Sequence, residues 1–332
     1  MPDTSEKQIL DKDFIPNFFP TCRINRNRYP VPIIIVVIIA GILAYMTYVL
    51  ADVKIDGGYI PGGSDPFIGL LNGLIFTVTA VISAFVMIYF AKKKGIIVLK
   101  YIFGLSFGFL GFFLTLFFGQ IIIYLIFVNL PENQILYDLY FILQNILLPI
   151  ASGIFTIFLL YKYMSEMTLL MKNFLVIYIG LLTGALLGVI MPLWTTLAIL
   201  IGISCWDIFA VLYKRGPIKE MIDLASQMDG DPMKDEEEIE KKIESGEAEY
   251  GTDKLEIGIG DLTFYSMLTS SALILSNNVI VMILSSIAII IGTGITISGL
   301  KRNKVLPGLP ISIFLGIGTM MFSWFIFSLI LP

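Results

Sequence analysis

The sequence contains no histidine and only two cysteines, Cys22 and Cys205. Without histidine the chain cannot carry Ser-His catalysis, an H-E-x-x-H zinc site or a histidine-ligated haem. Two cysteines are too few for a disulfide framework or a cysteine-rich metal site. Cys205 lies in an apolar stretch and is expected to be a small packing residue. We therefore expect neither a metal nor a cofactor.

Charged residues are also scarce, at 14% of the 332 residues, whereas soluble domains carry about 25%. Hydrophobic residues make up 57% of the chain, and the mean hydropathy is +0.87. They fall in long blocks, and about 20 apolar residues are needed for a helix to cross a bilayer. The first block is long enough to span, which favours a retained helix over a cleaved signal peptide. No basic cluster suggests nucleic-acid binding.

The apolar blocks predict nine transmembrane helices. Their expected ranges are 31–51, 66–91, 97–128, 138–161, 173–191, 193–213, 257–276, 279–300 and 309–331. Only Met191 and Pro192 separate the fifth block from the sixth, which predicts a tight connection there.

The basic residues predict the orientation of these helices. If the N-terminus is inside, all but one of the 22 basic residues fall on inside segments, and only Lys54 falls outside. Cytoplasmic segments of membrane proteins carry such an excess of Lys and Arg, and a wrong number of spans would scramble it. The expected fold is therefore an all-α polytopic membrane protein with nine transmembrane helices, its N-terminus inside and its C-terminus outside.

The same pattern divides the chain into three parts. Residues 1–30 form an N-terminal segment on the cytoplasmic side, and residues 31–191 form a bundle of the first five helices. Residues 192–332 hold the last four helices, with a cytoplasmic loop at 214–256. We expect the first part of this loop to lie along the membrane surface and its acidic part to be disordered.

Among 26 acidic residues, only Asp207 and Asp261 lie well inside the predicted spans. An intramembrane carboxylate costs on the order of 3 kcal/mol and usually marks a functional site. Asp207 lies seven residues before Lys214, at the inside end of its helix, and Asp261 lies five residues after Glu256. At about 1.5 Å per residue, both lie about 7–10 Å from the inside face. If the two helices are neighbours, the carboxyl groups meet at one level.

Two close carboxyl groups cannot easily both ionise, so such a pair shares one proton. This is the state that an aspartyl protease uses to activate water and to polarise a peptide carbonyl. Intramembrane acids also serve proton or cation transport, so a transporter or leak channel remains an alternative. A structural scaffold would leave the paired acids unexplained.

Three motifs around these residues resemble the presenilin and signal peptide peptidase family. G-I-G-D at 258–261 matches the family's GxGD signature, and W-D at 206–207 stands where the family has Tyr-Asp. P-G-L-P at 307–310 resembles its Pro-Ala-Leu motif at the start of the last helix. The resemblance is sharp over 200–330. The sequence departs from the family pattern at Trp206 and at Gly308, and either change could alter substrate preference or rate.

The resemblance implies an intramembrane aspartyl endopeptidase that hydrolyses transmembrane helical substrates within the lipid bilayer. The sequence itself does not imply accessory subunits. An inside catalytic loop looks like presenilin, because signal peptide peptidases are inverted. High Ile and Lys usage suggests the cell membrane of a prokaryote. Asp207 and Asp261 would be the catalytic pair, and the residues that would shape the site are Trp206, Gly258, Gly260, Pro307, Gly308, Leu309 and Pro310.

A helical substrate must unwind before its peptide bonds can be cut. We expect residues 254–257, in which polar and apolar residues alternate, to form a strand with the unwound substrate. Proline at Leu255 and Ile257 would then reduce cleavage.

Overall fold

The computed structural model describes residues 8–10, 19–55, 57–95, 97–131, 133–165, 168–212, 248–250, 254–300 and 308–330. Most of the loop 214–256, including the part expected at the membrane surface, lies outside these residues. So do half of the segment 1–30 and Pro307.

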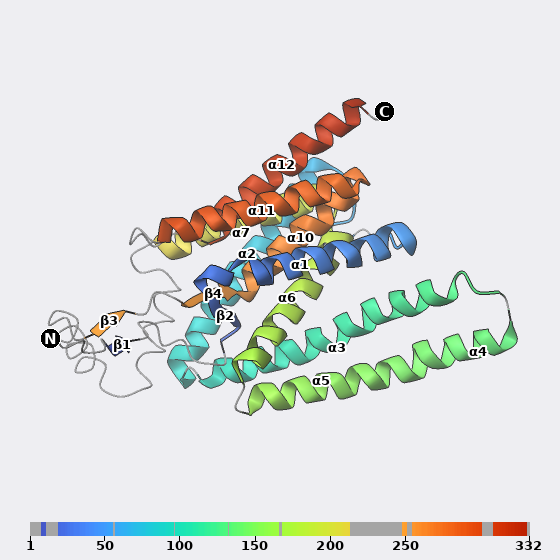
Figure 1. The fold of residues 1–332 in the computed structure, drawn as a ribbon, viewed down its shortest axis with the longest axis horizontal. Coiled ribbons are helices and arrows are strands. Elements are labelled where there is room, and N and C mark those ends of the chain that lie inside the picture. Colours follow the sequence, from blue (N-terminus) through green and yellow to red (C-terminus); the bar gives the residue numbers. More distant parts are fainter. Residues whose placement is uncertain are drawn as a thin grey trace, which may run out of the picture.

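The described residues are mainly helical (Figure 1). The first half contains α1 (Pro30–Ala44), the π-helical η2 (Tyr45–Leu50), α2 (Pro66–Lys94), α3 (Ile97–Phe127), α4 (Gln134–Ile142), the π-helical η3 (Leu143–Leu147) and α5 (Leu148–Met164). The second half contains α6 (Leu169–Ile190), α7 (Leu193–Leu212), α10 (Ile259–Ser276), α11 (Val279–Leu300) and α12 (Leu309–Ile330). The short elements are β1 (Gln8–Leu10), β2 (Thr21–Asn25), η1 (Arg26–Arg28), β3 (Ala248–Tyr250) and β4 (Lys254–Gly258).

Local sequence explains where the helices begin and end. Asp65 caps α2, because its carboxylate accepts from the Phe67 amide at 2.7 Å, and Pro66 occupies the first helical position. Acidic caps and proline are favoured there, since the first amides of a helix have no intrahelical partner. The same helix ends at Gly95, whose φ of +83° is readily available only to glycine.

Each of the nine predicted spans coincides with a helix or with a continuous helical run. Within the described residues, eight of these runs are long and apolar enough to cross a membrane. The remaining predicted span, 257–276, corresponds to α10, which is 18 residues long and is not among the eight. The chain is therefore an integral membrane protein of helical architecture.

Helix α10 lies at the centre of the bundle, beside α1, α6 and α11 (Figure 1). Its hydroxyl groups bond to its neighbours: Ser266 donates to the Leu181 carbonyl on α6, and Ser270 donates to the Ala40 carbonyl on α1. Side-chain hydroxyls of this kind hold helices together where water is absent. Because α10 faces other helices, it needs less apolar surface than a helix that faces lipid.

Small residues bring α6 into close contact with α10. A Cβ atom added to Gly188 would lie 2.6 Å from the Met267 carbonyl oxygen, and one added to Gly184 would overlap Ser266 and Thr263. The connection through Met191 and Pro192 is as short as predicted. The two helices that it joins then take different partners, since α6 packs mainly on α10 and α7 packs mainly on α2.

Two small sheets lie at the end of the bundle where α1 and α10 begin. β2 pairs antiparallel with β4, and β1 pairs parallel with β3. The strand predicted at 254–257 is therefore present, as β4. Its partner in the structure is the chain's own N-terminal segment, which the sequence did not lead us to expect.

Candidate active site

Asp261 is the third residue of α10, and Gly258 is the N-cap of that helix. The Asp261 carboxylate reaches back to the backbone amide of Gly258. An acidic side chain at this position satisfies an amide that the helix leaves unpaired. The G-x-G-D pattern thus places a carboxylate at the electropositive end of a helix.

Asp207 lies on α7 and contacts the beginning of a different helix, α12. The Leu309 amide donates to Asp207 Oδ2 at 3.2 Å, and the Gly308 amide also donates to this carboxylate. Leu309 is the first residue of α12, so its amide has no partner within the helix. Pro310, the next residue, has no amide hydrogen that would need one.

The two carboxyl groups meet beside the segment that precedes α12. Asp207 and Asp261 are close enough to interact electrostatically. A Cβ atom added to Gly308 would lie 3.4 Å from Asp261 Oδ2, so this residue, whose amide binds Asp207, also lies close to Asp261. Both aspartates are half-buried. The structure therefore brings together the two acids that the sequence placed at one level.

Trp206 is half-buried on α7 next to Asp207. Its ring makes an edge-to-face contact with Phe85 of α2, with ring centroids 5.9 Å apart, and packs against Phe209 at 5.6 Å. Edge-to-face and tilted aromatic pairs at this spacing are favourable. The indole thus tethers the Asp207 segment of α7 to α2.

Gly258 and Gly260 leave open space beside Asp261. The nearest atom to a Cβ added to Gly260 is on the ring of Phe264, at 3.9 Å, and for Gly258 it is Asp261 Oδ2, at 3.8 Å. Neither glycine is pressed against another helix, unlike Gly184 and Gly188. These distances therefore do not support the simpler explanation that the two glycines are needed for close packing between helices.

The sequence did not single out Tyr265 as a site residue. This buried tyrosine lies one helical turn after Asp261, and its hydroxyl contacts the Gly308 carbonyl at 3.5 Å and Ser312 Oγ at 3.3 Å. Ser312 in turn contacts Thr293 of α11 at 3.1 Å. This network fixes the start of α12 against α10 and α11. Residues four apart lie on the same face of a helix, so the position of this hydroxyl four residues after an intramembrane acid was the sequence signal that could have identified Tyr265.

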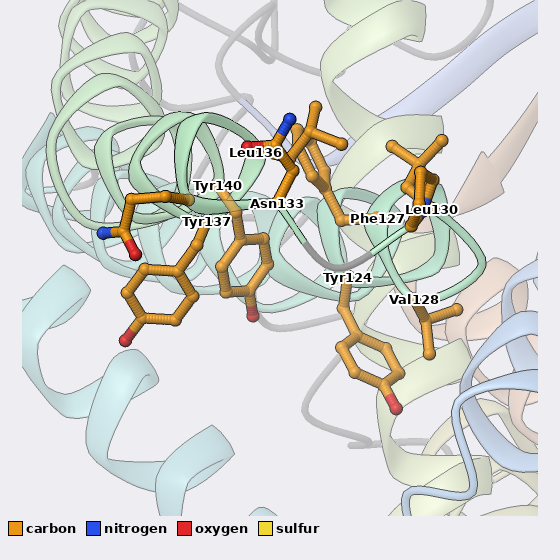
Figure 2. A pocket seen from close by; sticks show the side chains of 10 residues that line it. Tyr124, Phe127, Val128, Leu130, Asn133, Leu136, Tyr137 and Tyr140 are labelled. Carbon is orange, nitrogen blue, oxygen red and sulfur yellow. The ribbon is translucent and has the colours of Figure 1, made fainter.

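A separate cavity of about 580 Å³ lies at the turn between α3 and α4. Figure 2 shows the rings of Tyr124, Tyr137 and Tyr140 around it. The lining residues come from α3, α4 and the connecting turn, so this cavity is distinct from the place where the two aspartates meet.

The fold and the site together define a polytopic membrane protein in which two acids from different helices converge at two helix N-termini. The family model named Presenilin matches residues 61–233 and 226–331. The chain therefore belongs to the presenilin family.

Individual relatives agree with this assignment. The chain is 32% identical over 256 residues to Presenilin-B of Dictyostelium discoideum, a match that covers 75% of this chain and 47% of that protein. It thus spans about half the length of this relative. It is 24% identical over 326 residues to the presenilin-like protein At2g29900 of Arabidopsis thaliana, covering 76% of this chain and 77% of that protein.

A solved structure has the same fold. It is that of a presenilin family intramembrane aspartate protease, and the TM-score is 0.54 at 13% sequence identity. The match covers 89% of this chain and 97% of the other.

Proposed function

We propose that this protein is an intramembrane aspartyl endopeptidase that cuts transmembrane helical substrates with Asp207 and Asp261. One observation carries the proposal. The amides of Gly258, the N-cap of α10, and of Leu309, the first residue of α12, bind two carboxyl groups that meet inside the helical bundle. Structural packing needs no such convergence of acids, whereas peptide hydrolysis by the aspartyl-protease mechanism needs two carboxyl groups within reach of one peptide bond. Membership of the presenilin family and the fold of an aspartate protease support the same function.

The proposed reaction uses one proton shared by the pair. The ionised carboxylate takes a proton from water as its oxygen attacks the carbonyl carbon, while the protonated carboxyl donates to the carbonyl oxygen. The carboxyl group that took the proton from water then donates it to the amide nitrogen, and the other carboxylate takes a proton from a hydroxyl of the gem-diol. The C–N bond breaks, the amine leaves, and the new carboxyl end of the substrate is formed. The residues that hold the carboxyl groups in place are Gly258, Gly308 and Leu309.

The direct test compares purified wild type with Asp207→Asn and Asp261→Asn. Each variant keeps the size of the side chain and cannot act as a general base. We expect wild type, without other proteins, to cut a single-pass transmembrane peptide in liposomes, and each variant to be slower by about a hundredfold or more. The products are measured by mass spectrometry.

Two other results would contradict the protease assignment. If both variants cut as fast as wild type, the aspartates are not catalytic. If wild type moves protons or cations across the liposome membrane without cutting the peptide, and both variants abolish that flux, the transporter alternative is correct.

We further propose that the unwound substrate adds a strand to one edge of β4. The pairing of β4 with β2 supports one of its two edges for this role. Arg23 and Glu256 are opposite each other, and the Arg23 backbone amide and carbonyl bond to Asn173 and point away from β4. In an antiparallel ladder, residues alternate between facing the partner and facing away, so Leu255 and Ile257 face β2.

The backbone of Glu256 therefore faces the other edge of β4. The Gly258 amide, which lies on the same edge, reaches the Asp261 carboxylate. Proline at Leu255 or Ile257 would disturb the pairing with β2, so it is not the right test of substrate binding.

Substrates with single backbone N-methyl groups give a better test. N-methylation removes one donor at a time, so it should slow cleavage at every second position on the segment that pairs with β4. Cleavage rates for a series of consecutive N-methylated peptides would show the alternation. Equal rates along the whole series would rule out strand pairing.

A further inference from the structure

The N-terminal segment before α1 crosses the beginning of the helix that carries Asp261. β2 pairs with β4 in a register that runs from Thr21 opposite Gly258 to Asn25 opposite Lys254. The Pro20 carbonyl accepts from the Ile259 amide at 3.0 Å. Ile259 is the first residue of α10, so this bond satisfies an amide that the helix leaves free.

A single side chain fixes the outer edge of β2 to α6. The Asn173 amide accepts from the Arg23 backbone N–H at 2.8 Å and donates to the Arg23 carbonyl at 2.7 Å. These are the two bonds that a neighbouring strand would make to one residue. β2 is therefore held on both sides, by Asn173 of α6 and by β4.

Side chains reinforce this arrangement. Glu256 of β4 accepts from Thr21 Oγ1 at 2.7 Å and lies 3.6 Å from Arg23 Nε. Cys22 and Ile257, which are opposite each other, are both buried in the main core. Arg26 donates to the Ile297 carbonyl of α11 at 2.6 Å. The segment thus links α6, β4 and α11 at the end of the bundle where the two aspartates meet.

We propose that Asn173 is a positioning residue that, through β2, sets where β4 and Asp261 lie. This inference rests on the proposed protease function. β2 occupies the edge of β4 that faces away from the Asp261 carboxylate, so it supports the strand and leaves the other edge for the substrate. A strand that blocked the site would instead occupy the edge on which the Gly258 amide reaches Asp261.

Asn72 provides a matched control at the other end of the bundle. Its side-chain amide makes the same two bonds, to the Ile60 amide at 2.8 Å and to the Ile60 carbonyl at 2.9 Å. Ile60 precedes α2, so this pair lies where α2 begins, whereas the sheets lie where α1 and α10 begin. Asn72→Leu and Asn173→Leu therefore each remove two hydrogen bonds from a side-chain amide to one backbone residue, and only Asn173→Leu disturbs the candidate site.

The first measurement is the cleavage of a transmembrane peptide by these variants. We expect Asn173→Leu to lower kcat about ten- to a hundredfold with little change in KM, and to spread the cuts over neighbouring bonds, because misplaced catalytic groups slow the reaction. Asn173→Asp, which keeps the acceptor for the Arg23 amide and loses the donor, should be intermediate. Asn72→Leu should lower thermal stability and leave kcat and the cleavage site unchanged. An equal loss of kcat in both leucine variants would overturn the inference.

The second measurement asks whether a covalent link can replace Asn173. Cys22 and Ile257 are opposite each other in a hydrogen-bonded pair, for which the Cα atoms are about 5.5 Å apart, a separation that suits a disulfide. We expect the oxidised Asn173→Leu/Ile257→Cys protein to recover the wild-type rate and cleavage site, and reduction to remove both. An oxidised protein that is less active than the reduced one would show that β2 blocks the site, contrary to the proposal.

The third measurement does not depend on activity. Burial raises the pKa of the Cys22 thiol to about 11, so at pH 8 only about one thiol in a thousand is the reactive thiolate. Asn173→Leu should free β2 and speed alkylation of Cys22 about tenfold or more, since exposure returns the thiol toward its ordinary pKa. Asn72→Leu should not change it. Unchanged alkylation in Asn173→Leu would refute the inference even if the protein is a protease. If Cys22 is alkylated faster in Asn173→Leu but the wild-type protein cuts no peptide, only the proposed function is refuted.

Discussion

At the scale of single residues, Gly308 lies beside both aspartates. The presenilin motif has alanine at this position. A Cβ atom added to Gly308 would lie 3.4 Å from Asp261 Oδ2. This is an ordinary contact distance, so the structure has room for the family's alanine. The glycine is therefore not required by a collision with either carboxylate.

Gly308→Ala should keep proteolytic activity within about threefold of wild type, because substitutions without a steric conflict have small effects. Its methyl group should also reduce the freedom of the segment before α12 and raise the thermal midpoint slightly. Cleavage of a transmembrane peptide and thermal unfolding in detergent measure the two effects. A loss as large as that of Asp261→Asn would mean that the backbone at Gly308 must change conformation during the reaction.

At the scale of elements, the contact between α6 and α10 holds the Asp261 helix in the bundle. Gly184 allows this contact, since an added Cβ would overlap Ser266 and Thr263. We therefore expect Gly184→Ala to separate the helices, to cost on the order of 1–3 kcal/mol of stability and to lower proteolytic activity.

Gly153→Ala on α5 is the matched control for this prediction. Nothing lies within 4 Å of a Cβ added at Gly153. Alanine stabilises a helix by about 1 kcal/mol relative to glycine, so this variant should be at least as stable as wild type and equally active. Thermal unfolding and peptide cleavage distinguish the pair, and two variants with the same behaviour would show that the α6–α10 contact is not tight.

The division of the chain at residue 191 also belongs to this scale. The sequence separates a bundle of five helices from a part that carries both aspartates. In the structure, α6 belongs to the first part and α10 to the second, and they make the most extensive helix contact in the described residues. The proposed boundary thus describes where the motifs lie along the chain, and the two parts share one core.

At the scale of the whole molecule, α1 begins at one end of the bundle and α12 finishes at the other (Figure 1). We propose that the end at which α1 begins faces the cytoplasm, together with the loop 214–256. The basic residues favour this orientation, since only Lys54 falls on the opposite side.

Cysteine labelling tests the orientation. The background is a variant in which Cys22 and Cys205 are both replaced by serine. In it, Ser245→Cys would place a thiol in the loop 214–256, and Ser64→Cys would place one at the exposed start of α2. A membrane-impermeant maleimide added to intact cells should label the second variant and not the first. The reverse pattern would indicate the inverted orientation of signal peptide peptidases.

Much of the architecture was predictable because the bilayer acts on short stretches of sequence. A spanning segment needs a minimum apolar length, and basic residues stay inside, so composition alone gave the helices and a proposed orientation. The GxGD pattern likewise identified Asp261, and in the structure this acid binds the cap of its own helix, three residues before it. These features depend on neighbours in the sequence.

The contacts between distant segments were decided only by the tertiary structure. The Leu309 amide binds Asp207 from 102 residues away, and Asn173 binds Arg23 across 150 residues. No local pattern marks such partners, because a buried amide or hydroxyl bonds to whichever segment the packing brings near it. The sequence by itself determined which two acids enter the membrane, and the folded bundle decided that two helix N-termini and an N-terminal strand would hold them.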